Sequence, residues 1–214
     1  MPRGAGSQHE TQLRRLGDAA MRVLARDGLP ALTFRSVAGE AGVSPGRVQH
    51  YARTSKGLIT LTFRRFRELT QERVRESVGS VPSPTPIDVV EATLQALIPH
   101  GDQDRTLLHV AAAVELHALT DPGLAEELRG GRAELIRFLA EQVGRAWSGK
   151  RSVDPLALSR AATTLLATAE GLSTLALTGT IDGTEAQRNL HTCIRTTLTD
   201  FPATSLTAPG AGLR

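Results

Sequence analysis

Apolar residues recur along this chain at the spacing of an α-helix rather than in the alternation of a strand. In residues 10–27, for example, Leu13, Leu16, Ala20 and Val23 fall on one helical face. The same spacing predicts further helices at about 34–41, 45–51, 54–78, 87–99, 103–119, 122–147, 155–177 and 184–200. We therefore predict an all-α protein of about nine helices.

Composition supports this prediction. Hydrophobic residues make up 40% of the 214 residues but aromatic residues only 3%, so the core is expected to consist of Leu, Ala and Val. Such a core suits packed helices better than sheets, which favour β-branched and aromatic side chains.

Breaks in the pattern suggest the domain organisation. Residues 1–9 and 203–214 are polar or rich in small residues and are expected to be disordered, as an arm and a tail. Residues 10–53 are expected to form a three-helix head, and residues 54–202 a helical body. Within the body, three alternating prolines at 82, 84 and 86 forbid helix and favour an extended spacer.

Residues 32–58 are the most informative stretch. Thr33 can cap a short helix, and Gly42 stands where that helix must stop and the chain must turn. Ser44 then caps a second helix that has Pro45 at its first position, where a missing N–H costs nothing. This is the pattern of a helix-turn-helix, whose second helix enters the major groove of DNA.

Charge is distributed unevenly between the two parts of the chain. The net charge is +3, but residues 1–78 carry 14 Lys and Arg against 7 Asp and Glu. The remainder is acidic, with 11 basic residues against 15 acidic ones. A basic head on an acidic body is the arrangement expected of a protein that binds a polyanion.

Several classes of protein are disfavoured by what the sequence lacks. The single cysteine, Cys193, excludes an internal disulfide framework, and no metal-binding spacing of histidines is present. There is no Gly-rich phosphate loop and no nucleophile elbow, so we predict no cofactor, no metal and no enzymatic activity. No apolar run is long enough to span a membrane, and the start resembles no signal peptide, so we expect a cytoplasmic protein that does not contact membranes.

The segment 156–178 contains only one basic residue, Arg160, and one acidic residue, Glu170. A helix so poor in charge must be covered on most of its sides. Either it is the central helix of the core or it packs against a second copy of the chain, and the two are compatible in a homodimer. We predict that such a homodimer forms through residues 156–200.

The helix-turn-helix resembles that of the tetracycline-repressor (TetR) family of bacterial transcriptional regulators. The resemblance is carried by Leu32-Thr33-Phe34-Arg35-Ser36-Val37-Ala38, by Ala41-Gly42-Val43-Ser44-Pro45-Gly46-Arg47-Val48, by His50-Tyr51 and by Lys56-Gly57-Leu58. Two positions depart from the family: Ala52 stands where an aromatic residue is usual, and Lys56 lies one place after the family's lysine position, which is Ser55 here.

The resemblance implies a role for each residue of the head. Val37, Ala38, Val43 and Val48 are expected in its core. On the second helix, Arg47, Gln49 and His50 are expected to point away from that core, where Arg reads guanine and Gln reads adenine. The full predicted DNA-binding set is Thr33, Arg35, Ser44, Pro45, Gly46, Arg47, Gln49, His50, Tyr51 and Lys56.

In this family the C-terminal helices enclose a small-molecule pocket, and ligand binding moves the fourth helix to spread the two heads. Expected pocket residues here are Phe66, His109, Glu115, Phe138, Trp147, Thr168 and Glu170. The shortage of aromatic residues favours a small or aliphatic effector over a flat cationic dye. The resemblance thus predicts a dimeric repressor that a small molecule releases from operator DNA. The alternative is a helical enzyme or small-molecule carrier on the same scaffold without DNA binding.

Overall fold

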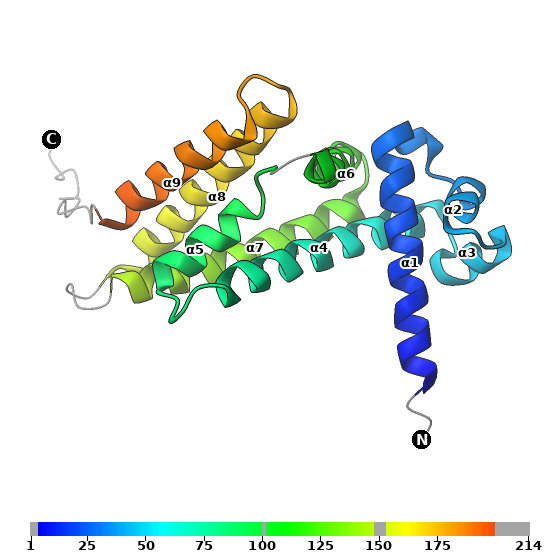
Figure 1. Ribbon diagram of the computed structural model, residues 1–214, viewed down its shortest axis with the longest axis horizontal. Helices are drawn as coiled ribbons and strands as arrows, with labels where there is room; N and C mark the ends of the chain where they lie inside the picture. The colour runs from blue at the N-terminus through cyan, green and yellow to red at the C-terminus, as the bar shows by residue number, and fades with distance from the viewer. Residues whose placement is uncertain (1–3, 100–101, 148–152, 200–214) are drawn as a thin grey trace, which may run out of the picture.

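The computed structural model describes residues 4–99, 102–147 and 153–199, which form nine α-helices and one short 3₁₀ turn, with no strand among them (Figure 1). The helices are α1 (Gly4–Asp27), α2 (Phe34–Ala41), α3 (Pro45–Ala52), α4 (Ser55–Gly79), α5 (Pro86–Gln95), α6 (Asp102–Ala118), α7 (Pro122–Ala146), α8 (Pro155–Leu177) and α9 (Gly183–Thr199). The prediction of an all-α protein is confirmed.

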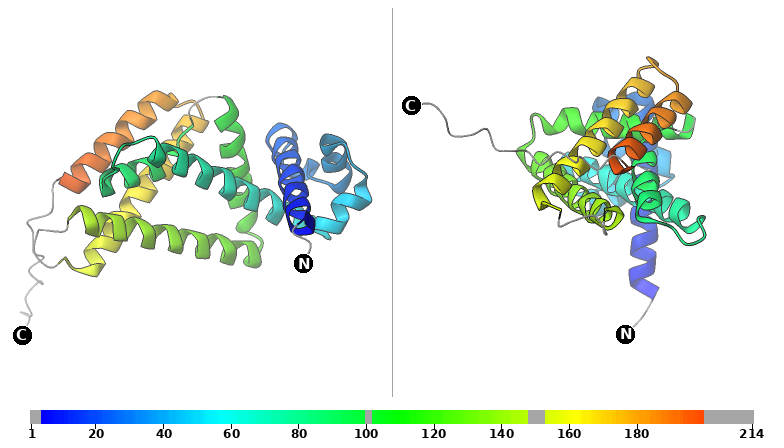
Figure 2. Two further views of the ribbon diagram at one scale, coloured as in Figure 1. Left: turned by 60° about the horizontal axis from the view of Figure 1, so that its bottom comes forward. Right: turned by 90° about the vertical axis from the view of Figure 1, so that its left-hand side faces the viewer.

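The molecule is elongated, with α1, α2 and α3 at one end and α8 and α9 toward the other (Figure 1). The long helix α4 leaves the head and runs into the body, where it contacts α5 and α6. The left view of Figure 2 shows α6 standing between α1 and the remaining body helices. Helix α6 contacts α1, α4, α7 and α8, so it touches both the head and the interior of the bundle.

The start of α1 corrects the prediction of a disordered arm over residues 1–9. Helix α1 already begins at Gly4, and residues 1–3 lie outside the described part of the chain, as does the predicted tail at 203–214. Contacts hold this first part of the helix: the ring of His9 lies 5.0 Å from that of Tyr51, and Glu10 pairs with Arg64 at 3.0 Å. Extending an existing helix fixes few additional dihedrals, so a polar segment with such contacts continues it.

Local signals in the sequence account for the short helices of the head. The Thr33 hydroxyl accepts a hydrogen bond from the Ser36 amide, and the Ser36 hydroxyl accepts one from the Thr33 amide, which closes a capping box on α2. Gly42 ends that helix in the left-handed region at φ 63°. The Ser44 hydroxyl caps α3 by accepting from the Arg47 amide at 3.3 Å.

The junction between α3 and α4 depends on a second glycine. Thr54 caps α4 by accepting from the Gly57 amide at 3.0 Å. The chain turns so tightly there that a Cβ on Gly57 would lie 1.7 Å from the Ala52 carbonyl oxygen. Ala52 itself is buried, so the position that usually holds an aromatic residue in the family is here filled by a close approach of the two backbones.

Two apolar clusters organise the core. The first joins α1, α2, α3 and the start of α4, and it also includes Val110 and Val114 of α6 and Leu124 and Leu128 of α7. The second gathers residues of α5, α7, α8 and α9. The head is therefore not closed at residue 53, because its core continues into helices of the body.

Arg65 anchors α4 to α1. Its side chain is only 12% exposed, and its Nε donates to Asp18 at 2.7 Å while the same guanidinium faces Glu68 at 3.3 Å and Glu72 at 3.7 Å. Gly17 makes the approach possible, since a Cβ there would lie 2.7 Å from the Arg65 Cβ. This cluster fixes the angle at which α4 leaves the head.

Candidate functional site

The outer face of α3 presents polar side chains, as the sequence predicted. Arg47, Gln49 and His50 are exposed, whereas Val48 between them is fully buried against the head core. Tyr51 is half-buried. The centroid of its ring lies 5.2 Å from that of His50, which stands edge-on to it, and 5.0 Å from that of His9. The helix is thus anchored by Val48 and Ala52 and offers the exposed positions between and before them to a partner.

The remaining head residues of the predicted set also lie at the surface. Thr33, Arg35, Ser44, Pro45 and Gly46 are exposed. Thr33 and Ser44 are both N-caps, so they stand at the two helix N-termini where backbone N–H groups are available to anions. No heavy atom lies within 4 Å of a Cβ built on Gly46, which leaves its backbone open to approach.

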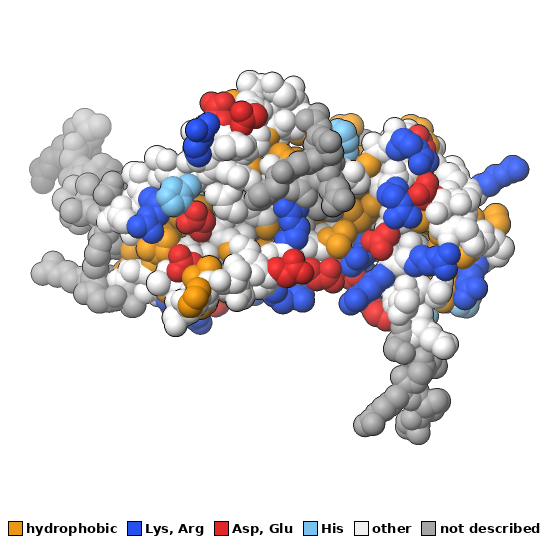
Figure 3. Space-filling model, viewed as in Figure 1, with side chains coloured by type: hydrophobic (Ala, Val, Ile, Leu, Met, Phe, Trp, Pro, Cys, Tyr) orange, Lys and Arg blue, Asp and Glu red, His pale blue; other side chains and the backbone are white. Residues whose placement is uncertain are grey.

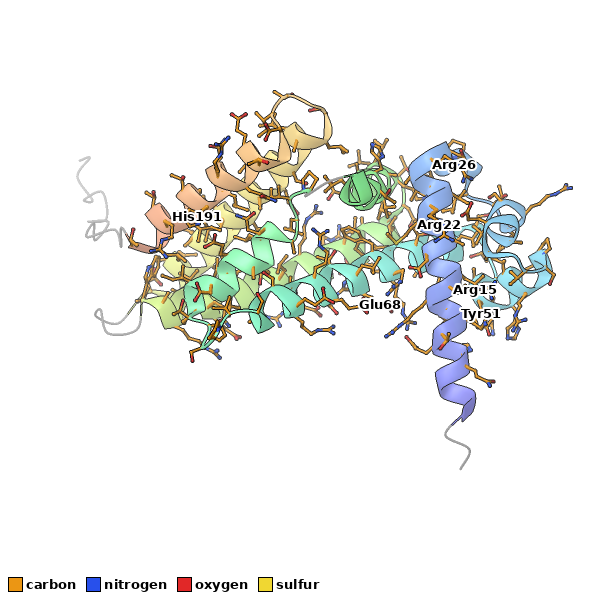
Figure 4. All side chains as sticks on the ribbon, in the orientation of Figure 1. Arg15, Arg22, Arg26, Tyr51, Glu68 and His191 are labelled. Atoms are coloured by element: carbon orange, nitrogen blue, oxygen red, sulfur yellow. The ribbon has the colours of Figure 1, made fainter. Side chains whose placement is uncertain are left out.

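The arginines of the head divide into two groups. Those of α1 are used internally: Arg15 donates to the Ala41 carbonyl at 2.8 Å, and Arg22 and Arg26 hold Glu40 at 2.7 and 3.1 Å (Figure 4). Within the described residues, the side chains of Arg35 and Arg47 make no hydrogen bond or ion pair. Basic side chains gather over this end of the molecule in Figure 3, and the second group supplies the charge available for a ligand.

Lys56 occupies a different position from the rest of the predicted set. Its Nζ donates to Asp121 at 2.8 Å, and Asp121 also caps α7 by accepting from the amides of Gly123 and Leu124. The hydrogen bond from Lys56, together with those from the two amides, holds the pKa of Asp121 below its ordinary value. In this conformation Lys56 therefore ties the start of α4 to the start of α7.

A cavity of about 540 Å³ opens among α4, the end of α5, α6, α7 and α8. Its wall is predominantly apolar and includes Phe63, Phe66, Leu128, Leu135, Phe138 and Leu166. Such a volume lies in the range of pockets that hold small organic ligands. The cavity adjoins the head, because Phe63 and Leu128 belong also to the first core cluster.

Four of the seven predicted pocket residues line this cavity: Phe66, Glu115, Phe138 and Glu170. The other three do not. His109 is exposed on α6, since its helical neighbour Leu108 takes the inward position. Trp147 is buried in the second core cluster, where its Nε1 donates to the Leu198 carbonyl at 3.1 Å. Thr168 faces α9, with its hydroxyl 3.9 Å from the Cys193 sulfur.

The polar centre of the cavity is an ion triad that joins three helices. Arg132 of α7 donates through Nε to Glu170 of α8 at 3.0 Å and through Nη2 to Glu115 of α6 at 2.5 Å. Partial burial acts to lower the pKa of Arg132, but the hydrogen bonds and charges of the two carboxylates outweigh it and raise that pKa. The triad remains accessible, with the three side chains between 39 and 50% exposed.

Arg132 is one of the pocket residues that the sequence analysis missed. The signal was present, because Leu128, Arg132 and Leu135 follow one helical face at i, i+4 and i+7, and all three line the cavity. An arginine on an otherwise apolar helical face indicates a charged side chain directed toward the interior that this face covers. Glu170 was identified on α8 because it stands alone in such a run.

Two features are absent from the described residues. None of their helices is long and apolar enough to cross a membrane. They also contain no group of three or more His, Cys, Asp and Glu side chains placed to hold a metal ion.

Comparison with known proteins agrees with both parts of the structure. Residues 86–199 match the family model described as BetI-type transcriptional repressor, C-terminal. The chain is 32% identical over 99 residues to the HTH-type transcriptional regulator BetI of Cronobacter sakazakii, which covers 46% of each chain. It is 25% identical over 137 residues to the HTH-type transcriptional regulator PksA of Bacillus subtilis, covering 62% of this chain and 66% of that one. The matches thus span between about half and two thirds of these curated relatives.

Solved structures extend the similarity over most of the chain. A transcriptional regulator from Rhodococcus sp. Rha1 superposes with a TM-score of 0.73 at 26% identity, covering 87% of this chain and 96% of that one. A putative regulator from Saccharomonospora viridis, solved in complex with choline, has the same fold, with a TM-score of 0.73 at 18% identity over 87% of this chain and 96% of its own. Because the family model alone covers more than half of the chain, and the head carries the matching helix-turn-helix, this protein belongs to the TetR family of transcriptional regulators and has a BetI-type C-terminal domain.

Proposed function

We propose that the protein is a dimeric, ligand-responsive repressor that binds operator DNA through α3 and is released when a small molecule enters the cavity. The observation that carries this proposal is the face of α3, where exposed Arg47, Gln49 and His50 flank buried Val48. An anchored helix with polar side chains directed outward is what insertion into the major groove requires.

Each side chain of the head has a distinct part in this proposal. Arg47 and Gln49 present the donor groups that pair with guanine and adenine edges. Arg35 and the N-termini of α2 and α3, at Thr33 and Ser44, hold phosphates. Tyr51, packed between two histidine rings, adds a hydroxyl at the edge of this surface.

The outward face of α8 supports the dimer. Thr164, Ala167, Gly171 and Leu175 recur at helical spacing, are exposed, and carry no charge. Such a face allows two copies of α8 to approach closely, and with α9 it forms the interface proposed at residues 156–200. Paired heads are also needed to read two half-sites one helical turn apart.

The cavity supports the response to a ligand. Phe66 of α4 lines it, and α4 continues directly from the helix-turn-helix. A structural neighbour was solved with choline, which supports ligand binding by proteins of this fold. A molecule that binds one placement of α4 better than the other shifts the population of heads competent for DNA.

The experiment is a gel shift at a stated salt concentration, using DNA from upstream of the protein's own gene and a random sequence of equal length. We expect Arg47→Ala to weaken operator binding by roughly 1–3 kcal/mol with little effect on random DNA. Arg35→Ala, the matched control, should weaken binding to both DNAs alike. Absence of any shift, with a folded dimer present, would overturn the proposal and favour a carrier or enzyme without DNA binding.

A further inference from the structure

The lining of the cavity restricts the class of ligand further than membership of the family does. The wall is mostly apolar, and its volume of about 540 Å³ is many times the roughly 15 Å³ that a single bound water needs. A compact polar molecule would leave most of this apolar surface without contacts. The occupant therefore needs an extended apolar body, which Phe66, Leu135, Phe138 and Leu166 would cover.

The charged triad of Arg132, Glu115 and Glu170 determines which polar head group a ligand can have. A cation would need the space between Glu115 and Glu170, which the guanidinium of Arg132 already occupies, so both hydrogen bonds of Arg132 would have to break. An anion needs only one exchange, in which it takes the Arg132 donors from Glu115. That exchange is cheap, because the Glu115 side chain is already 50% exposed and can turn to water.

The rest of the described lining agrees with an anion. It contains four arginines and three glutamates as its ionisable groups, so it is positive by one charge. Arg67 of α4 lies on the wall beside Gly131, where a Cβ would be 3.8 Å from its guanidinium carbon, and pairs with Glu134 at 3.6 Å. Guanidinium groups bind carboxylates in a two-point geometry that a hydroxyl or an ammonium cannot reproduce.

We propose that the effector is an amphipathic anion whose carboxylate displaces Glu115 from Arg132 and whose aliphatic tail fills the cavity. This rests on the proposed function, in which the cavity is the effector site. The displacement has a structural consequence, because the Glu115–Arg132 pair ties α6 to α7. Helix α6 places Val110 and Val114 in the core shared with the head, so untying it loosens the packing that holds α1 and α4.

Ligand binding by the full chain is measured first without DNA, by calorimetry, with decanoate, decanol, decyltrimethylammonium and choline. We expect decanoate to bind at least tenfold more tightly than the other three. Arg132→Met should weaken decanoate binding by roughly 10- to 100-fold and leave decanol unchanged. Arg129→Met, on the same helix but in an exposed pair with Glu126, is the matched control and should bind decanoate like the wild type.

A second variant distinguishes an anchoring role from a structural one. Glu115→Gln removes the carboxylate that competes for Arg132, so this variant should bind decanoate several-fold more tightly than the wild type. If Glu115 served only as a structural contact, its loss would weaken decanoate binding. Three results would each overturn the inference. The wild type could bind choline or decyltrimethylammonium more tightly than decanoate, it could bind none of the decyl probes, or Glu115→Gln could bind decanoate more weakly than the wild type does. Gel shifts with and without decanoate then test the proposed function separately: binding of decanoate to a chain that never shifts DNA refutes the repressor and leaves the ligand class standing.

Discussion

The head and the cavity of this protein differ in how far apart in the sequence their contacting residues lie. In the head, the helix caps and turns depend on residues a few positions apart, such as Thr33 with Ser36 or Gly57 with Ala52. The cavity combines side chains from Phe63 to Leu177 on five segments of the chain. The comparison teaches that a recognition surface can be specified by caps and turns, whereas a ligand site depends on the rotational register of several packed helices.

The largest expected effect tests the local part of this contrast. Gly57→Ala places a Cβ against the Ala52 carbonyl oxygen, a backbone atom that cannot rotate away, so the α3–α4 junction must open. We expect a loss of at least about 3 kcal/mol in the free energy of unfolding, measured with urea.

Gly39→Ala is the matched control for that variant. Gly39 lies on the exposed side of α2 with no atom within 4 Å of a built Cβ, so alanine should stabilise the protein by up to about 1 kcal/mol. If the two variants had equal stability, the junction would tolerate a side chain and the tight turn would not be what replaces the missing aromatic at Ala52.

The second prediction concerns the attachment of the head to the body. Arg65→Met removes the cation that Asp18, Glu68 and Glu72 share, in a site where the arginine is only 12% exposed, and leaves Glu68 with Arg14 and Arg64 alone. We expect a loss of about 2 kcal/mol, below the usual cost of breaking a fully buried pair. Arg64→Met, which removes a half-exposed arginine from the next position, should cost about 0.5 kcal/mol or less. Equal losses would show that the α1–α4 angle does not depend on the Arg65 cluster.

The same contrast explains how far the sequence could be interpreted. Caps at Thr33, Ser44, Asp121 and Asp154 were predictable because each bonds an amide two or three residues away. The start of α1 was not, because residues 4–9 have no apolar face, and the contacts at His9 and Glu10 come from Tyr51 and Arg64, distant in sequence. Arg132 itself lies on a helical face that local spacing can reveal, but its two carboxylates lie on other helices, so no short motif identifies the triad.

The smallest expected effect lies where the two regions meet, in the pair of Lys56 and Asp121. Asp121→Asn keeps an N-cap of equal quality for α7 and removes only the negative charge. The folded-state pKa of Asp121 lies below its ordinary value of 3.8, so its contribution to stability is complete above that value and is lost as pH falls through the lower folded pKa. At low salt and pH 7 the variant should therefore have a slightly lower Tm than the wild type.

Two trends identify the charge pair as the cause of that difference. The Tm difference should shrink as pH falls below 3.8, and also as added salt screens an exposed pair. Asp154→Asn is the matched control, because Asp154 caps α8 in the same way but has no ion-pair partner among the described residues. Equal Tm changes in the two variants would mean that the cap charge matters and Lys56 does not. Asp121→Asn also frees Lys56, which the sequence places in the DNA-binding set, so a contact of that lysine with a phosphate would make the variant bind DNA of any sequence more tightly.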